Sequence, residues 1–101
     1  MFVVQTTVKT RAQAQRIGSA LVREGLSACA SFWKVESVFF WEGKMRKETE
    51  WALELKCAGK NYARLSARLK KLHPYSLPQL LAFSPAKAGR EFSAWVEKGG
   101  G

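Results

Sequence analysis

The side chains that could do chemistry in this chain are few and far apart. Its only imidazole belongs to His73, and its only thiols belong to Cys29 and Cys57. Thiols and imidazole suit soft or borderline metals such as copper and zinc. A two-residue turn at residues 42–43 would place Cys29 opposite Lys56, one step from Cys57 but on the other face of the strand pair. A site for copper or another divalent cation on His73 and Cys29 is one interpretation, and buried structural thiols are the alternative.

Enzyme motifs are absent from the sequence. It contains no glycine-rich phosphate loop with a lysine, no GxSxG, no HExxH and no CxxC. With no aspartate and one histidine, a Ser-His-Asp triad cannot form. Glu48, Glu50 and Glu54 would share one strand face, but neighbouring lysines favour ion pairs across strands over paired catalytic carboxylates. The sequence therefore predicts a protein without catalytic activity.

The longest predicted element is a β-hairpin over residues 28–57. In its second arm, apolar residues alternate with other residues at the period of two that marks a strand with one buried face. Glu42-Gly43 supplies a short turn. Each arm of about 14 residues would extend for about 45 Å, far beyond the radius of gyration of roughly 13 Å for a domain of this size. Its far end must protrude, and its aromatic residues predict that it joins sheets of neighbouring subunits.

The remaining elements are read from periodicity and from start and stop signals. We expect a strand over 1–8 buried on both faces, and a helix over 11–24 that begins at Thr10 in a capping box with Gln13 and stops at Gly25. A helix over 60–72 should end at His73, before a proline. A strand over 77–84, a helix over 86–98 and a frayed tail of three glycines complete the chain. This order predicts an α+β, ferredoxin-like βαββαβ antiparallel sheet with a long protruding hairpin and an extra C-terminal helix, as one domain over residues 1–98.

The composition is that of a basic globular protein. The net charge is +9, and all eight acidic residues are glutamate. No apolar run approaches the length of about 20 residues that a membrane span needs, and no signal-peptide pattern precedes the first strand, so we expect a cytoplasmic protein. Basic residues are spread along the chain and not massed in a tail. We therefore expect the charge to serve solubility. Lys60, Arg64, Arg68 and Lys71 form a basic stripe on the second predicted helix that could dock phosphates, but a solvated face is the favoured interpretation, so nucleic-acid binding is the less favoured alternative.

Motifs along nearly the whole chain resemble the CutA1 family of divalent-cation tolerance proteins. The shared segments are VxxTT at residues 3–7, SACA at 27–30, WEGK at 41–44, Glu50, LxLK at 53–56 and HPYxxPxL at 73–80. This resemblance implies a homotrimer of ferredoxin-like subunits, similar in shape to PII signalling proteins, that acts without catalysis in tolerance of divalent cations such as copper. It also implies a cleft between subunits that could bind metal or small ligands weakly. The family motif residues at this cleft are Trp41, Lys44, Glu50, Lys56, His73 and Tyr75. A PII-like signalling or adaptor module that binds an anionic small molecule or a partner protein is the alternative.

The chain departs from the family at positions that matter for metal binding. Ser76 and Gln79 stand where the family usually has glutamate, so anionic oxygen ligands for a divalent cation are lost. Copper ligands proposed for some bacterial members are a cysteine near the end of the first strand and a pair of histidines before the proline. Thr6 and Leu72 occupy two of those positions, and only His73 is retained. We therefore expect weak copper binding at most.

Overall fold

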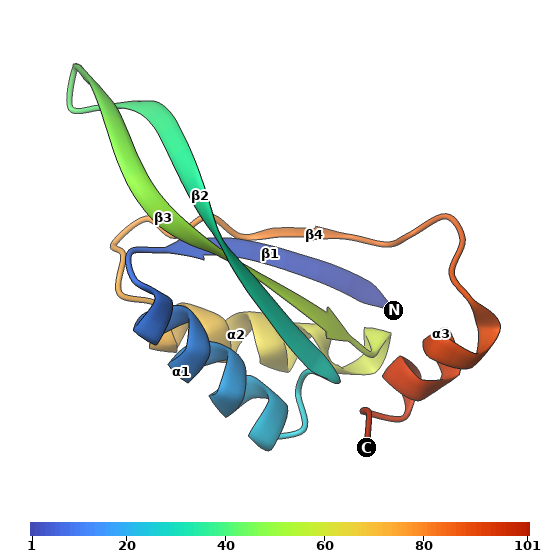
Figure 1. Ribbon diagram of the computed structural model, residues 1–101. Coiled ribbons are helices and arrows are strands. Elements are labelled where there is room, and N and C mark those ends of the chain that lie inside the picture. The colour runs from blue at the N-terminus through green and yellow to red at the C-terminus, as the bar shows by residue number, and fades with distance from the viewer.

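The computed structural model describes residues 1–101 and contains the elements in the predicted order. Four strands form one antiparallel sheet in the order β2-β3-β1-β4. Figure 1 shows α1 and α2 side by side on one face of this sheet and the β2-β3 hairpin protruding beyond it. The predicted ferredoxin-like plan is therefore confirmed. The elements are β1 (Phe2–Val8), α1 (Arg11–Arg23), β2 (Cys29–Trp41), β3 (Lys44–Cys57), a 3-10 turn (Gly59–Asn61), α2 (Tyr62–Leu72), β4 (Leu81–Phe83) and α3 (Arg90–Glu97).

Helix α1 begins and ends at the residues that its sequence predicts. The Thr10 side chain accepts from the Gln13 amide, and the Gln13 side chain accepts from the Thr10 amide, which completes the capping box. At the other end Gly25 has a φ of 74°. Its amide donates to the Val22 carbonyl, and the Leu26 amide donates to the Leu21 carbonyl, in the Schellman pattern. These caps fix where the helix stops and where the chain turns toward β2.

The hairpin is the longest feature of the molecule and has the predicted register. Strands β2 and β3 pair without interruption from Trp41 opposite Lys44 to Cys29 opposite Lys56. The two turn residues both have positive φ, 52° at Glu42 and 77° at Gly43, as a type I′ turn requires. The molecule is 45 Å long on its principal axis, and the end of the hairpin extends past the helices (Figure 1).

The core lies between the sheet and the two helices. Alternate residues of β1 are buried there, whereas the residues between them are only half-buried. The expectation that β1 is buried on both faces is therefore wrong for the single chain, because no layer covers the second face of the sheet. The buried core cluster consists of Val4, Val8, Ala14, Ile17, Leu21, Leu26, Leu53, Leu55, Cys57, Leu65 and Leu69.

None of the helices has the length and apolar character that crossing a membrane requires.

The C-terminal third differs most from the sequence prediction. Strand β4 is only Leu81–Phe83, not residues 77–84, because Pro78 has no amide to donate and the Gln79 carbonyl accepts from a threonine side chain. Helix α3 is Arg90–Glu97, not residues 86–98. Its C-terminus is capped by the glycine tail, whose Gly99 and Gly100 amides donate to the Val96 and Trp95 carbonyls. These two glycines therefore form a helix cap instead of fraying.

Candidate functional site

A buried cluster of polar side chains lies where α2 ends. His73 Nε2 is 2.9 Å from Thr6 Oγ1 and 3.0 Å from the Thr7 carbonyl oxygen, both on β1. The Tyr75 hydroxyl donates to Glu50 Oε2 at 2.7 Å, which ties the segment after α2 to β3. His73 and Glu50 are each only 8% exposed. The end of α2 therefore places His73 against β1, and the segment that follows it places Tyr75 against β3.

The hydrogen bonds assign the protonation state of His73. The Tyr75 amide donates to Nδ1 at 3.1 Å, so Nδ1 is an acceptor and the ring proton is on Nε2. Thr6 Oγ1 donates its own proton to the Gln79 carbonyl at 2.6 Å. It therefore accepts from Nε2–H, which it shares with the Thr7 carbonyl. Both ring nitrogens are satisfied within the chain, and the imidazole is neutral.

The surroundings of the cluster favour uncharged rings. Burial lowers the pKa of His73, although the hydrogen bond to Thr7 and the charge of Glu50 partly offset this effect. Burial raises the pKa of Tyr75, and the hydrogen bond to Glu50 raises it further. The Glu50 carboxylate thus accepts from a neutral phenol, whose ring lies 5.0 Å from the neutral imidazole of His73. Such a cluster suits positioning and recognition, since neither ring changes charge near neutral pH.

Copper does not fit the ligands of a single chain. No group of three histidine, cysteine, aspartate or glutamate side chains is close enough to hold a metal ion. Nδ1 of His73 uses its lone pair on the Tyr75 amide, and Nε2 carries a proton. Cys29 is paired with Lys56 at the opposite end of the sheet, far from the Thr6–Thr7 end where His73 lies. The structure therefore does not bring the two predicted metal ligands together.

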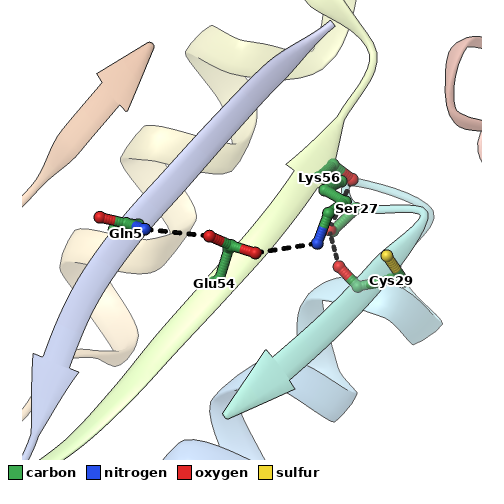
Figure 2. A network of polar contacts seen from close by, with 5 residues as sticks. All are labelled: Gln5, Ser27, Cys29, Glu54 and Lys56. Carbon is green, nitrogen blue, oxygen red and sulfur yellow. Dashed lines mark hydrogen bonds and ion pairs between the residues drawn. The ribbon is translucent and has the colours of Figure 1, made fainter. Parts of the chain in front are cut away.

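A second polar network lies on the face of the sheet that no helix covers. Figure 2 shows Gln5 and Lys56 donating to the two oxygens of the Glu54 carboxylate, each at 2.9 Å. Ser27 donates to the carbonyls of Cys29 and Lys56 at 2.8 and 2.9 Å, which fixes the start of β2 against the end of β3. The pKa of the Glu54 carboxyl is lowered by these hydrogen bonds, from Gln5 first and then Lys56. The network joins three strands where the sheet is uncovered.

The six predicted cleft residues fall in three places. Glu50, His73 and Tyr75 come together in the buried cluster. Trp41 and Lys44 are an exposed pair at the hairpin end. Lys56 belongs to the network on the uncovered face (Figure 2). In a single chain they do not form one cleft.

Sequence reasoning missed the partners of these residues. It singled out Thr6 only as a replacement for a thiol and not as the hydroxyl that accepts from His73. Gln5 and Glu54 are opposite each other in the β1-β3 register, so the alternation of the two strands could have indicated that this pair lies on one face. The contact of Thr6 with the Gln79 carbonyl joins segments far apart in the sequence, and no local pattern indicates it.

Known proteins match the chain along its whole length. A family model described as CutA1 divalent ion tolerance protein matches residues 2–99. The divalent-cation tolerance protein CutA of Thermus thermophilus is 33% identical, over 98% of this chain and 97% of the relative. The fold also matches a solved CutA of Archaeoglobus fulgidus, described as periplasmic, with a TM-score of 0.92 at 28% identity over 98% of each chain. A PII-like protein CutA from Nostoc matches with a TM-score of 0.91 at 29% identity, over 98% of this chain and 96% of that chain.

The matches agree with the residues described above. The segments 41–44 and 73–80 that resemble the family supply the hairpin end and the loop that contains His73 and Tyr75. The sheet order and the long β2-β3 hairpin agree with the high TM-scores. The chain belongs to the CutA1 divalent ion tolerance protein family.

Proposed function

We propose that the protein works as a homotrimer, without catalysis, in the cytoplasmic tolerance of divalent cations such as copper. The observation that carries this proposal is the apolar surface at the end of the hairpin. Val38 is 63% exposed, Phe40 72% and Met45 66%. A long edge ribbon with such side chains aggregates unless another chain covers it. Arg46 adds a buried Nε donor with no hydrogen-bond partner in the chain, which a neighbouring carbonyl would satisfy.

The topology of the sheet supports a closed ring of subunits. Its two edges, β2 and β4, are different strands. Pairing different surfaces head to tail gives a heterologous interface, which closes into a ring when the rotation allows. The uncovered face of the sheet also exposes large side chains, including Trp33 at 43%, Leu81 at 52% and Phe83 at 47%. A ring of three subunits would bury this face and the hairpin ends together.

Such a ring would bring the separated motif residues of neighbouring subunits into one site. A hairpin that crosses onto a neighbouring subunit takes Trp41 and Lys44 away from their own chain and toward the next one. There they would meet the cluster of Glu50, His73 and Tyr75, or the network around Lys56. The resulting cleft is the site we propose for weak binding of a divalent cation or a small ligand. Its metal ligands would have to come from more than one subunit, since one chain holds no suitable group of three.

The oligomeric state is the direct test. Light scattering at micromolar concentration should give about three times the chain mass of 11.3 kDa. Replacing two exposed apolar residues of the hairpin end, as in V38K/F40K, should reduce the mass to that of a monomer, because charge there opposes burial. The matched control L77K changes an exposed leucine outside the sheet and the hairpin and should leave the mass unchanged. A stable, soluble monomer of the native chain would overturn the trimer.

Copper binding tests the proposed ligand class. Affinity rises along the first-row metals to Cu(II), so copper is the most sensitive probe of a residual site. Titration calorimetry should show weak binding, and His73→Ala should change it little, because both ring nitrogens are already used. A stoichiometric, tight copper site that His73→Ala abolishes would show that His73 rotates out of its cluster to bind metal.

A PII-like signalling or adaptor role is the second candidate, favoured by the likeness to the Nostoc protein described as PII-like. In this case the clefts would bind an anionic small molecule or a partner protein. Calorimetry with nucleotides beside copper and zinc separates the two. Heat from a nucleotide at a stoichiometry of one per subunit, with none from the metals, would favour the signalling role.

A further inference from the structure

The positive charge of the molecule is concentrated in one layer. The two helical segments, residues 9–25 and 59–73, together carry nine basic residues and one acidic residue. The rest of the chain carries eight basic and seven acidic residues and is close to neutral. The basic stripe expected on the second helix is part of this layer, and the basic residues of the first helix add to it. The fold places both segments on the same face of the sheet (Figure 1), so almost all of the net charge of +9 belongs to the helix layer.

The basic side chains point away from the sheet. On α1, Arg16 and Arg23 are exposed and lie opposite the buried face of Ala14, Ile17 and Leu21. They are seven residues apart, about 10 Å along a helix, and they flank a shallow groove of about 370 Å³. The rest of its lining is small or polar: Ala12, Gln15, Ser19 and Ala20. An extended anionic chain could lie in this groove between the two guanidinium groups.

Helix α2 continues the same surface. Arg64, Lys70 and Lys71 are exposed there, away from the buried Leu65 and Leu69. The only nearby acid is Glu24, and the Arg68 guanidinium occupies both of its oxygens at 2.9 to 3.3 Å. That ion pair joins the two helices and leaves the other cations of the layer without a carboxylate. We call the exposed residues Arg16, Arg23, Arg64, Lys70 and Lys71 the cationic helix face.

A surface that serves only solubility usually mixes both signs of charge. Neither α1 nor α2 contains an acidic residue, including in its first turn, where acids are favourable. The helices therefore gain none of the Glu–Lys pairs that stabilise exposed helices by a few tenths of a kcal/mol each. Cations of the face that have no carboxylate partner, such as Arg64 and Lys71 two helical turns apart, repel each other instead. A polyanion bound across the face would relieve that repulsion.

From this arrangement we infer that the cationic helix face binds the phosphate backbone of double-stranded nucleic acid without reading its sequence. Arginine pairs with phosphate in a bidentate manner, and five of the seven basic residues of α1 and α2 are arginine. Val22 is the only large exposed apolar residue on these helices, so the face has too little apolar surface to insert into a membrane. No exposed aromatic ring lies there either, which removes the stacking that holds single strands.

The experiment measures fluorescence anisotropy of a labelled DNA duplex of about 20 base pairs as salt is varied. Neutralising about five phosphates predicts a slope near −4.5 for log affinity against log salt, and a loss of at least a hundredfold between about 50 and 200 mM salt. R16Q/R23Q and K70Q/K71Q should each reduce the slope by about 2 and weaken binding at about 50 mM salt at least tenfold. The control K87Q/R90Q removes the same charge from an exposed segment outside the helix layer and should change the affinity less than twofold.

Several outcomes would overturn the inference. One is no binding of the duplex at about 50 mM salt. Another is an equal loss of affinity in K87Q/R90Q, which would make the effect one of net charge alone. Single-stranded DNA bound as tightly as the duplex would point to stacking, and displacement of the duplex by phosphatidylserine-containing vesicles would point to a membrane. Circular dichroism and light scattering of each variant must match the native protein, so that a failure to fold or assemble is not counted as a loss of binding.

Discussion

One imidazole ring joins three parts of this chain. His73 ends α2, contacts the backbone and a side chain of β1, and accepts from the amide of Tyr75 in the loop toward β4. Every polar atom of the ring has a partner, and the ring must be neutral to keep the acceptor at Nδ1. A proton added there would leave two donors, His73 Nδ1–H and the Tyr75 amide, facing each other. The cluster is therefore sensitive to acid.

We predict that stability falls as the pH drops through the range in which an unfolded histidine gains its proton. Burial lowers the pKa of His73 in the folded state, whereas the unfolded chain titrates near 6.5. The unfolded state binds more protons below that pH, so acid favours unfolding by up to about 1.4 kcal/mol per pH unit. Urea midpoints measured between about pH 7.5 and 5.5 should decrease, and His73→Gln should flatten the profile. Three carboxyls also have a lowered pKa in the folded state, those of Glu24, Glu54 and Glu97. Their protonation destabilises the protein only at lower pH, so it does not mask the effect of His73 in this pH range.

The two thiols should react at very different rates. Cys57 is fully buried in the core, and burial raises the pKa of its thiol, so little reactive thiolate is present or accessible. Cys29 is half-buried at the start of β2. In a Cys29→Ser variant, a thiol reagent should label Cys57 only as fast as the protein opens. Fast labelling that follows thiolate formation would instead make Cys57 a reactive group.

At the scale of elements, the hairpin turn controls the most conspicuous feature of the fold. Both of its residues have left-handed φ, which glutamate adopts less readily than asparagine. Glu42→Asn should therefore stabilise the protein by a few tenths of a kcal/mol, since Asn-Gly is the preferred pair for this turn. Gly43→Val should destabilise it by about 1–2 kcal/mol, because a β-branched residue at positive φ is strained. Thermal midpoints at one fixed protein concentration would reveal the difference, and a neutral Gly43→Val would mean that the turn is not rigid.

Elements with strong local signals could be predicted from the sequence. The cap residues Thr10 and Gly25 and the alternation in β3 act over a few positions, so their elements have nearly the predicted bounds. Strand β4 depends on a single short pairing with β1, and its local sequence did not show that only three residues would pair. The glycines after α3 looked like a tail because a Schellman cap is visible only when the helix end is known. The predicted cysteine register was confirmed since it followed from the turn alone.

The contacts within the candidate site could not be predicted from local sequence patterns. His73, Tyr75 and Glu50 were selected because their motifs resemble a family and not because any spacing indicated that they touch. Their contact depends on β3 pairing with β1 while α2 crosses both, a property of the whole sheet. The basic stripe of the second helix was visible in its spacing, but its joining with the basic residues of α1 into one layer was not, because that depends on both helices covering the same face of the sheet.

At the scale of the whole molecule, removal of the hairpin end is the sharpest test of assembly. We predict that replacing residues 38–47 by a two-residue Asn-Gly turn yields monomer or aggregate, because the surfaces that the ribbon covers in a trimer become unpaired. The core lies between the helices and the other part of the sheet, so the shortened chain should still show helical circular dichroism. Sedimentation would measure its mass. A shortened chain that remains trimeric would move the assembly interface to the uncovered face of the sheet.

The order of strands in the sheet also has a consequence for the folding pathway. The β2-β3 ribbon closes over a two-residue turn, and such hairpins form within about 1–10 μs. Strand β1 must instead find β3 and β4 across roughly 50 and 80 residues of chain, and closing such long loops costs more entropy. On a ribosome, β1 emerges first, can pair with β3 only after residue 57 has been made, and gains its second partner only when β4 follows. The aromatic ribbon is thus the first pair of strands that the nascent protein can form, and its exposed side chains stay uncovered while the slower pairings of β1 are completed.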